Sequence, residues 1–188
     1  TKPMSESQML VFDCETNGLL HDVSTIHCIA IYDSLKKETS VFNDQGDQRP
    51  ITEALHWLSS ADVIIGHNII GYDLPVIKKV YSWYESSAAV IDTLVLSRLY
   101  HPNMMEIDSV IDKRTGKRKC RWDNMPLQLL GRHSLEAYGY RLGEYKGEFG
   151  KTTDWQEWSQ EMQDYCVQDV QVTTKLCEHF RPLMTRVD

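Results

Sequence analysis

The first 42 residues contain three segments in which apolar, β-branched or aromatic residues dominate and turn-forming residues intervene. The segments are residues 9–12, 26–32 and 38–42, and the turns lie at Asn17-Gly18 and Asp33-Ser34. Short apolar runs bounded by such turns are typical of β-strands that follow one another in an antiparallel sheet. The pattern therefore predicts an antiparallel meander at the start of the chain.

Behind this meander, segments with helical spacing alternate with short apolar runs. Helices are expected at 51–58, 74–83, 94–99 and 134–140, and strands at 62–66 and 90–91. A last long helix is expected to follow a Thr153…Gln156 capping box and to run to about residue 180. Between residues 100 and 131 the pattern breaks into turn residues and charge, which predicts a functional loop or partial disorder. The order of elements predicts an α/β fold with a mixed sheet covered by helices.

Length and composition favour one domain. A chain of 188 residues, 41% of them hydrophobic, can bury one good core. We place the domain at residues 9–184, and expect 1–8 to be a tail that follows a removed initiator methionine or was added for expression. No apolar run is long enough to span a membrane and no signal peptide opens the chain, so a soluble, cytoplasmic protein is expected. The five cysteines lack Cys-x-x-Cys spacing, which indicates reduced thiols rather than disulfides or a zinc site.

The charge distribution leaves two interpretations of one segment open. A net charge of −7 counts against a protein that binds polyanions. Six of the nine residues from 113 to 121 are nevertheless Lys or Arg. Such a run is either a solvated loop or a contact for nucleic acid, and the pattern does not separate the two.

Four carboxylates and a tyrosine are the candidates for chemistry. Asp13 and Glu15 close the first strand on the same side of the extended chain, about 7 Å apart along it, where both can hold one metal ion. Asp73 begins a helix, which capping would also explain. Tyr165 and Asp169 are four residues apart and share a helix face, although a surface pair would look the same. Buried carboxylates need a cation or hydrogen-bond donors, so three such placements indicate a shared metal site.

The order of these motifs resembles that of a known enzyme family. Asp-x-Glu after the first strand, Asn68-x4-Asp73 after a later strand and Tyr-x3-Asp in a late helix are similar to the motifs of the DEDDy 3′–5′ exonucleases. Residues 91–99, 133–143 and 164–170 resemble the proofreading domain of family A DNA polymerases from short-tailed T-odd bacteriophages. The likeness covers about residues 9–180. It implies a ribonuclease-H-like (DnaQ-like) fold with a mixed five-stranded sheet flanked by helices.

The resemblance also implies an activity and roles for the five residues. Two Mg²⁺ or Mn²⁺ ions would be held by Asp13, Glu15, Asp73 and Asp169, and Tyr165 would orient the attacking water. The substrate would be single-stranded DNA or a frayed 3′ end of duplex DNA, hydrolysed from the 3′ end to nucleoside 5′-monophosphates. The partner would be a DNA polymerase domain or subunit, which could belong to the same native chain.

Seven further residues are candidates for substrate contact. They are Thr16, Asn17, Leu19, His67, Asn68, Lys117 and Arg118. The family places an apolar wedge near the position of Leu19, and core packing is the alternative for this side chain. His67 and Asn68 precede Asp73, although a histidine after a buried strand is more often structural. Lys117 and Arg118 are candidates on charge alone.

Other residues near the motifs are expected to be structural. Cys14 should point away from Asp13 and Glu15 into the core, because successive strand side chains alternate faces. Asp92 is interpreted as the cap of the helix at 94–99. The aromatic stretch that includes Trp155 could stack bases, but packing is the favoured interpretation.

Two other functions remain compatible with these motifs. A stand-alone exoribonuclease of the same fold would differ in its response to the 2′-hydroxyl. A binding module that kept the fold and lost the chemistry would bind nucleic acid without hydrolysing it.

Overall fold

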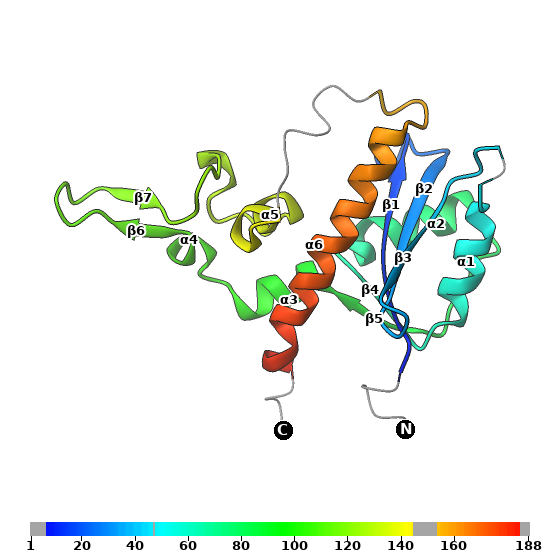
Figure 1. The fold of residues 1–188 in the computed structure, drawn as a ribbon, viewed down its shortest axis with the longest axis horizontal. Coiled ribbons are helices and arrows are strands. Elements are labelled where there is room, and N and C mark those ends of the chain that lie inside the picture. The colour runs from blue at the N-terminus through cyan, green and yellow to red at the C-terminus, as the bar shows by residue number, and fades with distance from the viewer. Residues whose placement is uncertain (1–6, 47, 145–153, 185–188) are drawn as a thin grey trace.

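A mixed five-stranded sheet forms the centre of the protein (Figure 1). The computed structural model describes residues 7–46, 48–144 and 154–184. The strands are β1 (Met9–Thr16), β2 (Ile26–Asp33), β3 (Glu38–Phe42), β4 (Val63–Gly66) and β5 (Ala89–Asp92), in the order β3-β2-β1-β4-β5. The β1–β2 and β2–β3 pairs are antiparallel, whereas β1–β4 and β4–β5 are parallel. The predicted meander and the predicted mixed sheet are both confirmed.

Helices follow the order that the sequence pattern predicts, with shifted ends. They are α1 (Ile51–Ser60), α2 (Leu74–Val80), α3 (Thr93–Tyr100), α4 (Met104–Ile107), α5 (Leu135–Leu142) and α6 (Gln160–Met184), with a π-helical turn η1 (Ile69–Asp73) before α2 and a 3₁₀ turn η2 (Leu127–Leu129). Helix α6 begins later than expected, and the Ser159 hydroxyl accepts a hydrogen bond from the Met162 amide there. Thr153 of the expected capping box lies outside the described residues.

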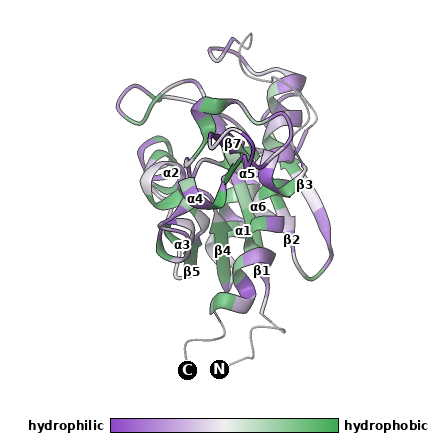
Figure 2. Cartoon of the chain, turned by 90° about the vertical axis from the view of Figure 1, so that its left-hand side faces the viewer, coloured by the Kyte–Doolittle hydropathy of each residue, from purple (hydrophilic) through white to green (hydrophobic). Residues whose placement is uncertain are grey.

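Alternation along β1 divides the core between the two faces of the sheet. Leu10, Phe12 and Cys14 belong to the core cluster that β1–β4 form with α1 and α2. Val11 packs on the opposite face, where Cys166 and other residues of α6 cover the sheet. Figure 2 shows the central strand β4 at the apolar end of the colour scale. The core position expected for Cys14 is confirmed, and by the same alternation Asp13 and Glu15 lie on the α6 face.

The segment from 100 to 131 has more structure than the loop that its sequence predicts. It contains α4, η2 and a two-stranded hairpin, in which β6 (Ser109–Ile111) pairs with β7 (Arg118–Cys120) antiparallel. In Figure 1 this hairpin projects away from the sheet beside α4. Strands of three residues beside six Lys or Arg show no clear apolar alternation, which is why the expectation of a loop was wrong.

One buried carboxylate fastens the base of this hairpin. The Asp108 side chain is fully buried and receives two hydrogen bonds from Arg141 of α5, at 2.7 and 2.6 Å. It also accepts from the Trp122 indole and the Gly131 amide, both at 2.8 Å. Burial alone would raise the pKa of Asp108, but these donors hold it below its ordinary value. The Asp108 cluster therefore joins α4, the hairpin, the following loop and α5.

All five cysteines are free thiols, as predicted. No helix in the described part of the chain has the length and apolar character needed to cross a membrane.

Candidate metal centre

Strand β1 and helix α6 meet at the Asp-x-Glu pair. The Cys166 thiol donates a hydrogen bond to the main-chain oxygen of Asp13 at 3.3 Å, which fixes α6 against the strand. Carboxylate oxygens of Asp13 and Glu15 and the Cys166 sulfur lie within 4.8 Å of one another. Because Tyr165 precedes Cys166 and Asp169 follows it by three positions, the helix presents all three side chains toward this end of β1.

Asp73 reaches the same place from a different direction. Strand β4 pairs with β1 only as far as Val11, so beyond this residue that edge of β1 has no partner among the strands of the described residues. Asp73 Oδ1 accepts a hydrogen bond from the Cys14 amide at 3.1 Å and takes the place of the missing strand. The Asp73 side chain is thereby bound to the residue between Asp13 and Glu15, and it is itself buried.

The turn that delivers Asp73 needs a glycine and a second carboxylate. A Cβ on Gly66 would lie 2.1 Å from Ile69 Cγ2 and 3.0 Å from the Phe12 oxygen, so the chain can bend into η1 only with glycine there. The Asp92 carboxylate accepts from the amides of Asn68, Ile70 and Leu94 at 2.8, 3.0 and 2.9 Å. Asp92 is thus the predicted cap of α3, and it also holds the start of η1.

The four carboxylates form one electrostatic unit. Burial raises the pKa of Asp13 well above its ordinary value, and the charge of Asp169 raises it further. Burial and the charges of Asp13 and Asp169 act in the same direction on the pKa of Glu15. Burial together with Asp13 also raises the pKa of Asp73, although the Cys14 amide opposes the shift. The pKa of Asp169 rises to about 7, through burial, Asp73 and Glu136. The mutual influence of these charges shows that the predicted carboxylates converge.

The donor set fits divalent metal ions. Asp13 Oδ2 is buried and accepts no hydrogen bond from any described residue. Leaving a buried carboxylate oxygen without a donor is costly, and Coulomb repulsion among four carboxylates adds to the cost. Hard cations such as Mg²⁺ and Mn²⁺ prefer carboxylate oxygens, and their charge would offset both penalties.

Tyr165 keeps its proton at neutral pH. Burial raises the pKa of this phenol far above its ordinary value, and the charges of Asp169, Glu15 and Asp13 add to the shift. A phenol in this state donates a hydrogen bond and cannot act as a strong base. This agrees with an orienting role.

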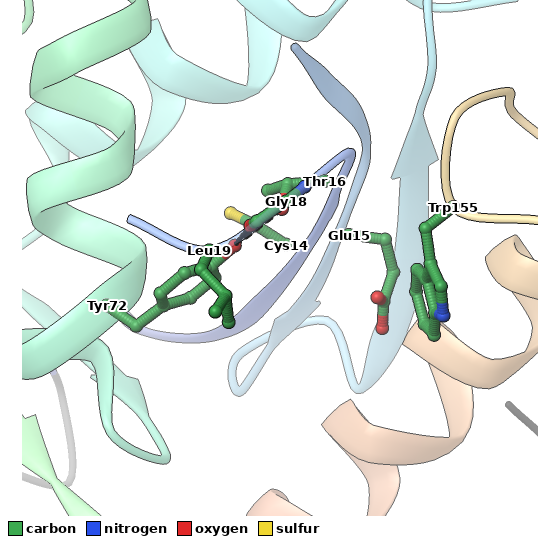
Figure 3. Close-up of a pocket in the computed structure, with 7 residues that line it drawn as sticks. All are labelled: Cys14, Glu15, Thr16, Gly18, Leu19, Tyr72 and Trp155. Atoms are coloured by element: carbon green, nitrogen blue, oxygen red, sulfur yellow. Dashed lines mark hydrogen bonds between the residues drawn. The ribbon is translucent and has the colours of Figure 1, made fainter. Parts of the chain in front are cut away.

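A cavity of about 330 Å³ opens beside the carboxylates (Figure 3). Its lining is mostly apolar, with Leu19 and Tyr72 on one side and Trp155 next to Glu15 on the other. Leu19 is 67% exposed, so this leucine does not pack in the core. The volume falls at the lower end of the range that small-molecule sites occupy, roughly 300–1,000 Å³.

Hydrogen bonds hold the loop that carries Leu19. The Tyr72 hydroxyl donates to the Gly18 oxygen and lies 2.5 Å from the Thr16 hydroxyl, so Thr16 lines the cavity with its polar group engaged. The Asn17 side chain accepts from the amides of Ser24 and Thr25 at 3.0 and 3.1 Å, which closes the loop. Asn17 therefore supports the cavity and, unlike Thr16 and Leu19, does not line it.

Trp155 and Tyr72 are the cavity residues that sequence reasoning missed. Trp155 is held in place because its main-chain oxygen lies 2.9 Å from His27 Nε2 and the next side chain, Gln156, donates to the Asn17 oxygen at 3.4 Å. The interpretation of Trp155 as a packing residue was wrong in that its side chain lines the cavity. The adjacency of Tyr72 to Asp73 was the available signal for the tyrosine.

His67 and Asn68 line a different cavity, together with Arg98, Arg132 and His133. Both ring nitrogens of His67 are engaged, Nδ1 with the Thr93 hydroxyl at 2.8 Å and Nε2 with the His133 oxygen at 2.9 Å. Since a carbonyl only accepts, Nε2 carries the proton and Nδ1 accepts. Burial lowers the pKa of His67 to about 4, so the ring is neutral near pH 7. The geometry matches the structural alternative for His67.

Lys117 and Arg118 lie on the projecting hairpin and not beside the carboxylates (Figure 1). The structure thus brings together the five predicted catalytic residues with Thr16 and Leu19. It leaves His67 and Asn68 in a neighbouring cavity and the two cations apart from both.

Comparison with known proteins gives consistent results. Residues 10–181 match the family model described as the RNase H superfamily. The DNA-directed DNA polymerase of Enterobacteria phage T3 is 36% identical over 90% of this chain, and that of Escherichia phage T7 is 35% identical over 90%. The chain spans 26% of the length of each of these two relatives.

Solved structures of nucleases share the fold. Brucella melitensis NrnC with bound Mg²⁺ superimposes with a TM-score of 0.58 at 18% identity, covering 96% of this chain and 75% of that one. E. coli exonuclease I in complex with a dT13 oligonucleotide gives a TM-score of 0.55 at 14% identity, covering 97% and 42%. At these identities the likeness shows the fold alone.

Proposed function

The chain belongs to the RNase H superfamily, and from that membership and the site geometry we propose that it is a metal-dependent 3′–5′ exonuclease acting on DNA. The observation that carries the proposal is that Asp13, Glu15, Asp73 and Asp169 lie close enough to raise one another's pKa, while Asp13 Oδ2 is buried without a hydrogen-bond donor among the described residues. Such a cluster has little structural value, because it destabilises the folded protein without cations.

Asp13, Glu15, Asp73 and Asp169 would hold the metal. Two bound divalent ions would stabilise both the attacking and the leaving oxygen in an in-line displacement at phosphorus. The protein contributes position: Cys166 and Cys14 tie the helix and Asp73 to β1, so that all four carboxylates belong to rigid elements. A site built on rigid elements holds its reactants at low entropic cost.

Tyr165 would orient the attacking water. Its raised pKa leaves the hydroxyl protonated, so it donates a hydrogen bond to an oxygen nucleophile or to a non-bridging phosphate oxygen. The product would be a nucleoside 5′-monophosphate released from the 3′ end.

The cavity between Leu19 and Trp155 would receive the 3′-terminal base. Every base has a π-face, so stacking on an aromatic side chain tolerates any sequence, as an exonuclease requires. A 3′-terminal pyrimidine and a 3′-terminal purine would therefore enter the same cavity. Its position beside Glu15 would bring the terminal phosphodiester to the carboxylates.

The phage polymerase relatives support DNA as the substrate and a polymerase as the partner. We propose that the domain proofreads for a DNA polymerase, in the same native chain or as a subunit, in the cytoplasm of a bacterial host. The exoribonuclease alternative differs at the 2′-hydroxyl, so matched DNA and RNA strands separate the two. Faster hydrolysis of RNA would refute the choice of DNA.

The test is product analysis on a single DNA strand labelled at the 5′ end, with Mg²⁺, with Mn²⁺ and with EDTA. A ladder that shortens one nucleotide at a time from the 3′ end is expected only with metal. Asp13→Ala and Asp169→Ala should abolish it, whereas Asp164→Ala should not. Asp164 is an exposed residue of the same helix whose carboxylate accepts from Gln160 at 2.9 Å. Activity in both site variants, or in EDTA, would contradict the proposal.

A further inference from the structure

Positive charge is concentrated on the projecting hairpin and its flanks, residues 109–121, which we name the arm. The arm has six Lys or Arg and one Asp, a net charge of +5, whereas the other 175 residues have 14 Lys or Arg and 26 Asp or Glu, a net charge of −12. A strongly basic element on an acidic protein directs negatively charged partners to that element and away from the rest.

The charges of the arm are not neutralised within the described part of the chain. The ion pairs found there join His21 to Asp22, Arg49 to Glu53, Arg141 to Asp108 and Lys175 to Glu144, so none involves an arm cation. Lys113, Arg114, Lys117, Lys119 and Arg121 are exposed. Arg118 donates to the Ser109 hydroxyl at 3.1 Å, a neutral acceptor that leaves its charge in place.

The arm is a built element, not a loose tail. Its single acidic side chain, Asp112, accepts from the amides of Arg114 and Thr115 at 2.9 and 3.3 Å, so it shapes the turn. Gly116, at a positive φ of 68°, donates to the Asp112 oxygen, and the Asp112 amide donates to Lys117 across the turn. Lys113 and Lys117 are thus held at the tip. Ordering charges before binding reduces the entropic cost of the contact.

The base of the arm fixes its direction. Cys120 packs with Trp122 and Met125 on the inner side, and the Asp108 cluster fastens the same segment to α5. Lys119 pairs with Val110 on the face opposite to Cys120, because neighbouring strand residues alternate sides. Lys119 therefore projects outward from this packed base.

We propose that the arm binds the sugar–phosphate backbone of duplex DNA next to the frayed 3′ end that enters the carboxylate site. The identity of this nucleic acid rests on the proposed function. Duplex DNA offers one negative charge per about 1.7 Å of axis, and a two-stranded ribbon fits its major groove. Three residue steps of extended chain from Ser109 to Asp112, where the turn begins, give a reach of about 10 Å, which is about three base pairs. The single-stranded end has its own apolar cavity, so the duplex portion is the part that needs this second contact.

The test compares two matched double variants. Lys113→Gln/Lys117→Gln removes two arm charges, and Lys36→Gln/Lys37→Gln removes two exposed charges from the turn between β2 and β3. Fluorescence anisotropy is measured in EDTA with a duplex bearing a three-nucleotide frayed 3′ end and with a 15-nucleotide single strand, from 50 to 200 mM salt. For the duplex, the slope of log affinity against log salt should become less steep by about 1.8 in the arm variant only. The ratio of the parent's affinity for the duplex to that of the arm variant should therefore fall about tenfold as the salt rises from 50 to 200 mM.

Three results would overturn the proposal: an unchanged slope for the duplex, the same loss in the Lys36/Lys37 variant, or the same loss on the single strand. A second pair, Arg114→Gln/Lys119→Gln, guards against a fold defect in the first and should give the same slope change. Hydrolysis of a single-stranded tetranucleotide by the parent with Mg²⁺ is measured alongside, because this substrate has a 3′ end and no duplex portion. If the parent does not hydrolyse the tetranucleotide, the proposed function is refuted. The binding measurements in EDTA do not depend on hydrolysis and so test the arm by itself.

Discussion

Replacing Asp169 by Asn should stabilise the metal-free protein at alkaline pH while it abolishes hydrolysis. The pKa of Asp169 is about 7 in the folded protein and 3.8 ordinarily. A carboxyl whose pKa is raised on folding contributes stability that is fully present below the unfolded pKa and is lost as the pH rises through the folded pKa. Above pH 7 the ionised Asp169 therefore lowers the unfolding free energy, and a neutral asparagine at this position removes that destabilisation.

The magnitude follows from the pKa difference. About three pH units at 1.36 kcal/mol each correspond to about 4 kcal/mol at pH 8.5. Only part of this cost, about 1.7 kcal/mol, is present at pH 5. The gain in unfolding free energy of Asp169→Asn over the parent should therefore grow by about 2–3 kcal/mol from pH 5 to pH 8.5. Taking the difference cancels the intrinsic effect of the amide and the titration of groups that Asp169 does not influence, such as His67. The pKa values of Asp13 and Glu15, which the charge of Asp169 raises, should fall in the variant.

Urea unfolding in EDTA across this pH range measures the effect, with Asp164→Asn as the control on the exposed side of α6. With Mg²⁺ at 100 times the parent's Kd the gain should shrink by up to about 2.7 kcal/mol, because the bound ion stabilises the parent and the variant lacks one ligand. A gain that does not change with pH, or an equal gain in Asp164→Asn, would refute the electrostatic reasoning.

Three other predictions concern single contacts. Trp155→Ala should raise KM for single-stranded DNA about tenfold with little change in kcat, because stacking is worth about 1–3 kcal/mol per base, and Trp155→Phe should restore most of it; an effect confined to kcat would contradict the stacking role. Asp108→Ala should lower the unfolding free energy by about 3–5 kcal/mol in urea titrations, and adding Arg141→Met should recover part of the loss, since the buried unpaired charge is then gone. His67, with a folded pKa of about 4, should remain neutral and protonated on Nε2 in NMR spectra at pH 5.5. Stability linked to His67 is lost as the pH falls from 6.5 to 4, and a titration midpoint near 6.5 would contradict this assignment.

The sheet and the proximity of the four candidate carboxylates could be predicted because their signals are local or ordered along the chain. Apolar runs bounded by turns located all five strands of the main sheet. The positions of Asp13, Asp73 and Asp169 at the ends or on the faces of such elements indicated the site. The alternation along β1 even separated Cys14 from its acidic neighbours. The strands and the position of Cys14 need only the period of one element, whereas the site also needs the order of the motifs along the chain.

What could not be predicted depends on contacts between distant segments. The interaction of Asp108 with Arg141 spans 33 residues, and nothing in either neighbourhood indicates the partner. The same holds for His67 with His133, where both ring nitrogens are engaged by residues that periodicity cannot bring together. Trp155 lines the cavity only because the segment before α6 is tied to β2 through His27.

The hydrogen bond from the Cys14 amide to Asp73 makes the sheet itself a reporter of the site. This amide belongs to a central strand, yet its acceptor is a carboxylate that a cation would also attract. Its hydrogen-exchange rate therefore measures how firmly Asp73 is seated, independently of any substrate. An isotope-exchange experiment that follows this one amide during a Mn²⁺ or Mg²⁺ titration could detect occupancy of the Asp73 side of the centre without a chemical reaction.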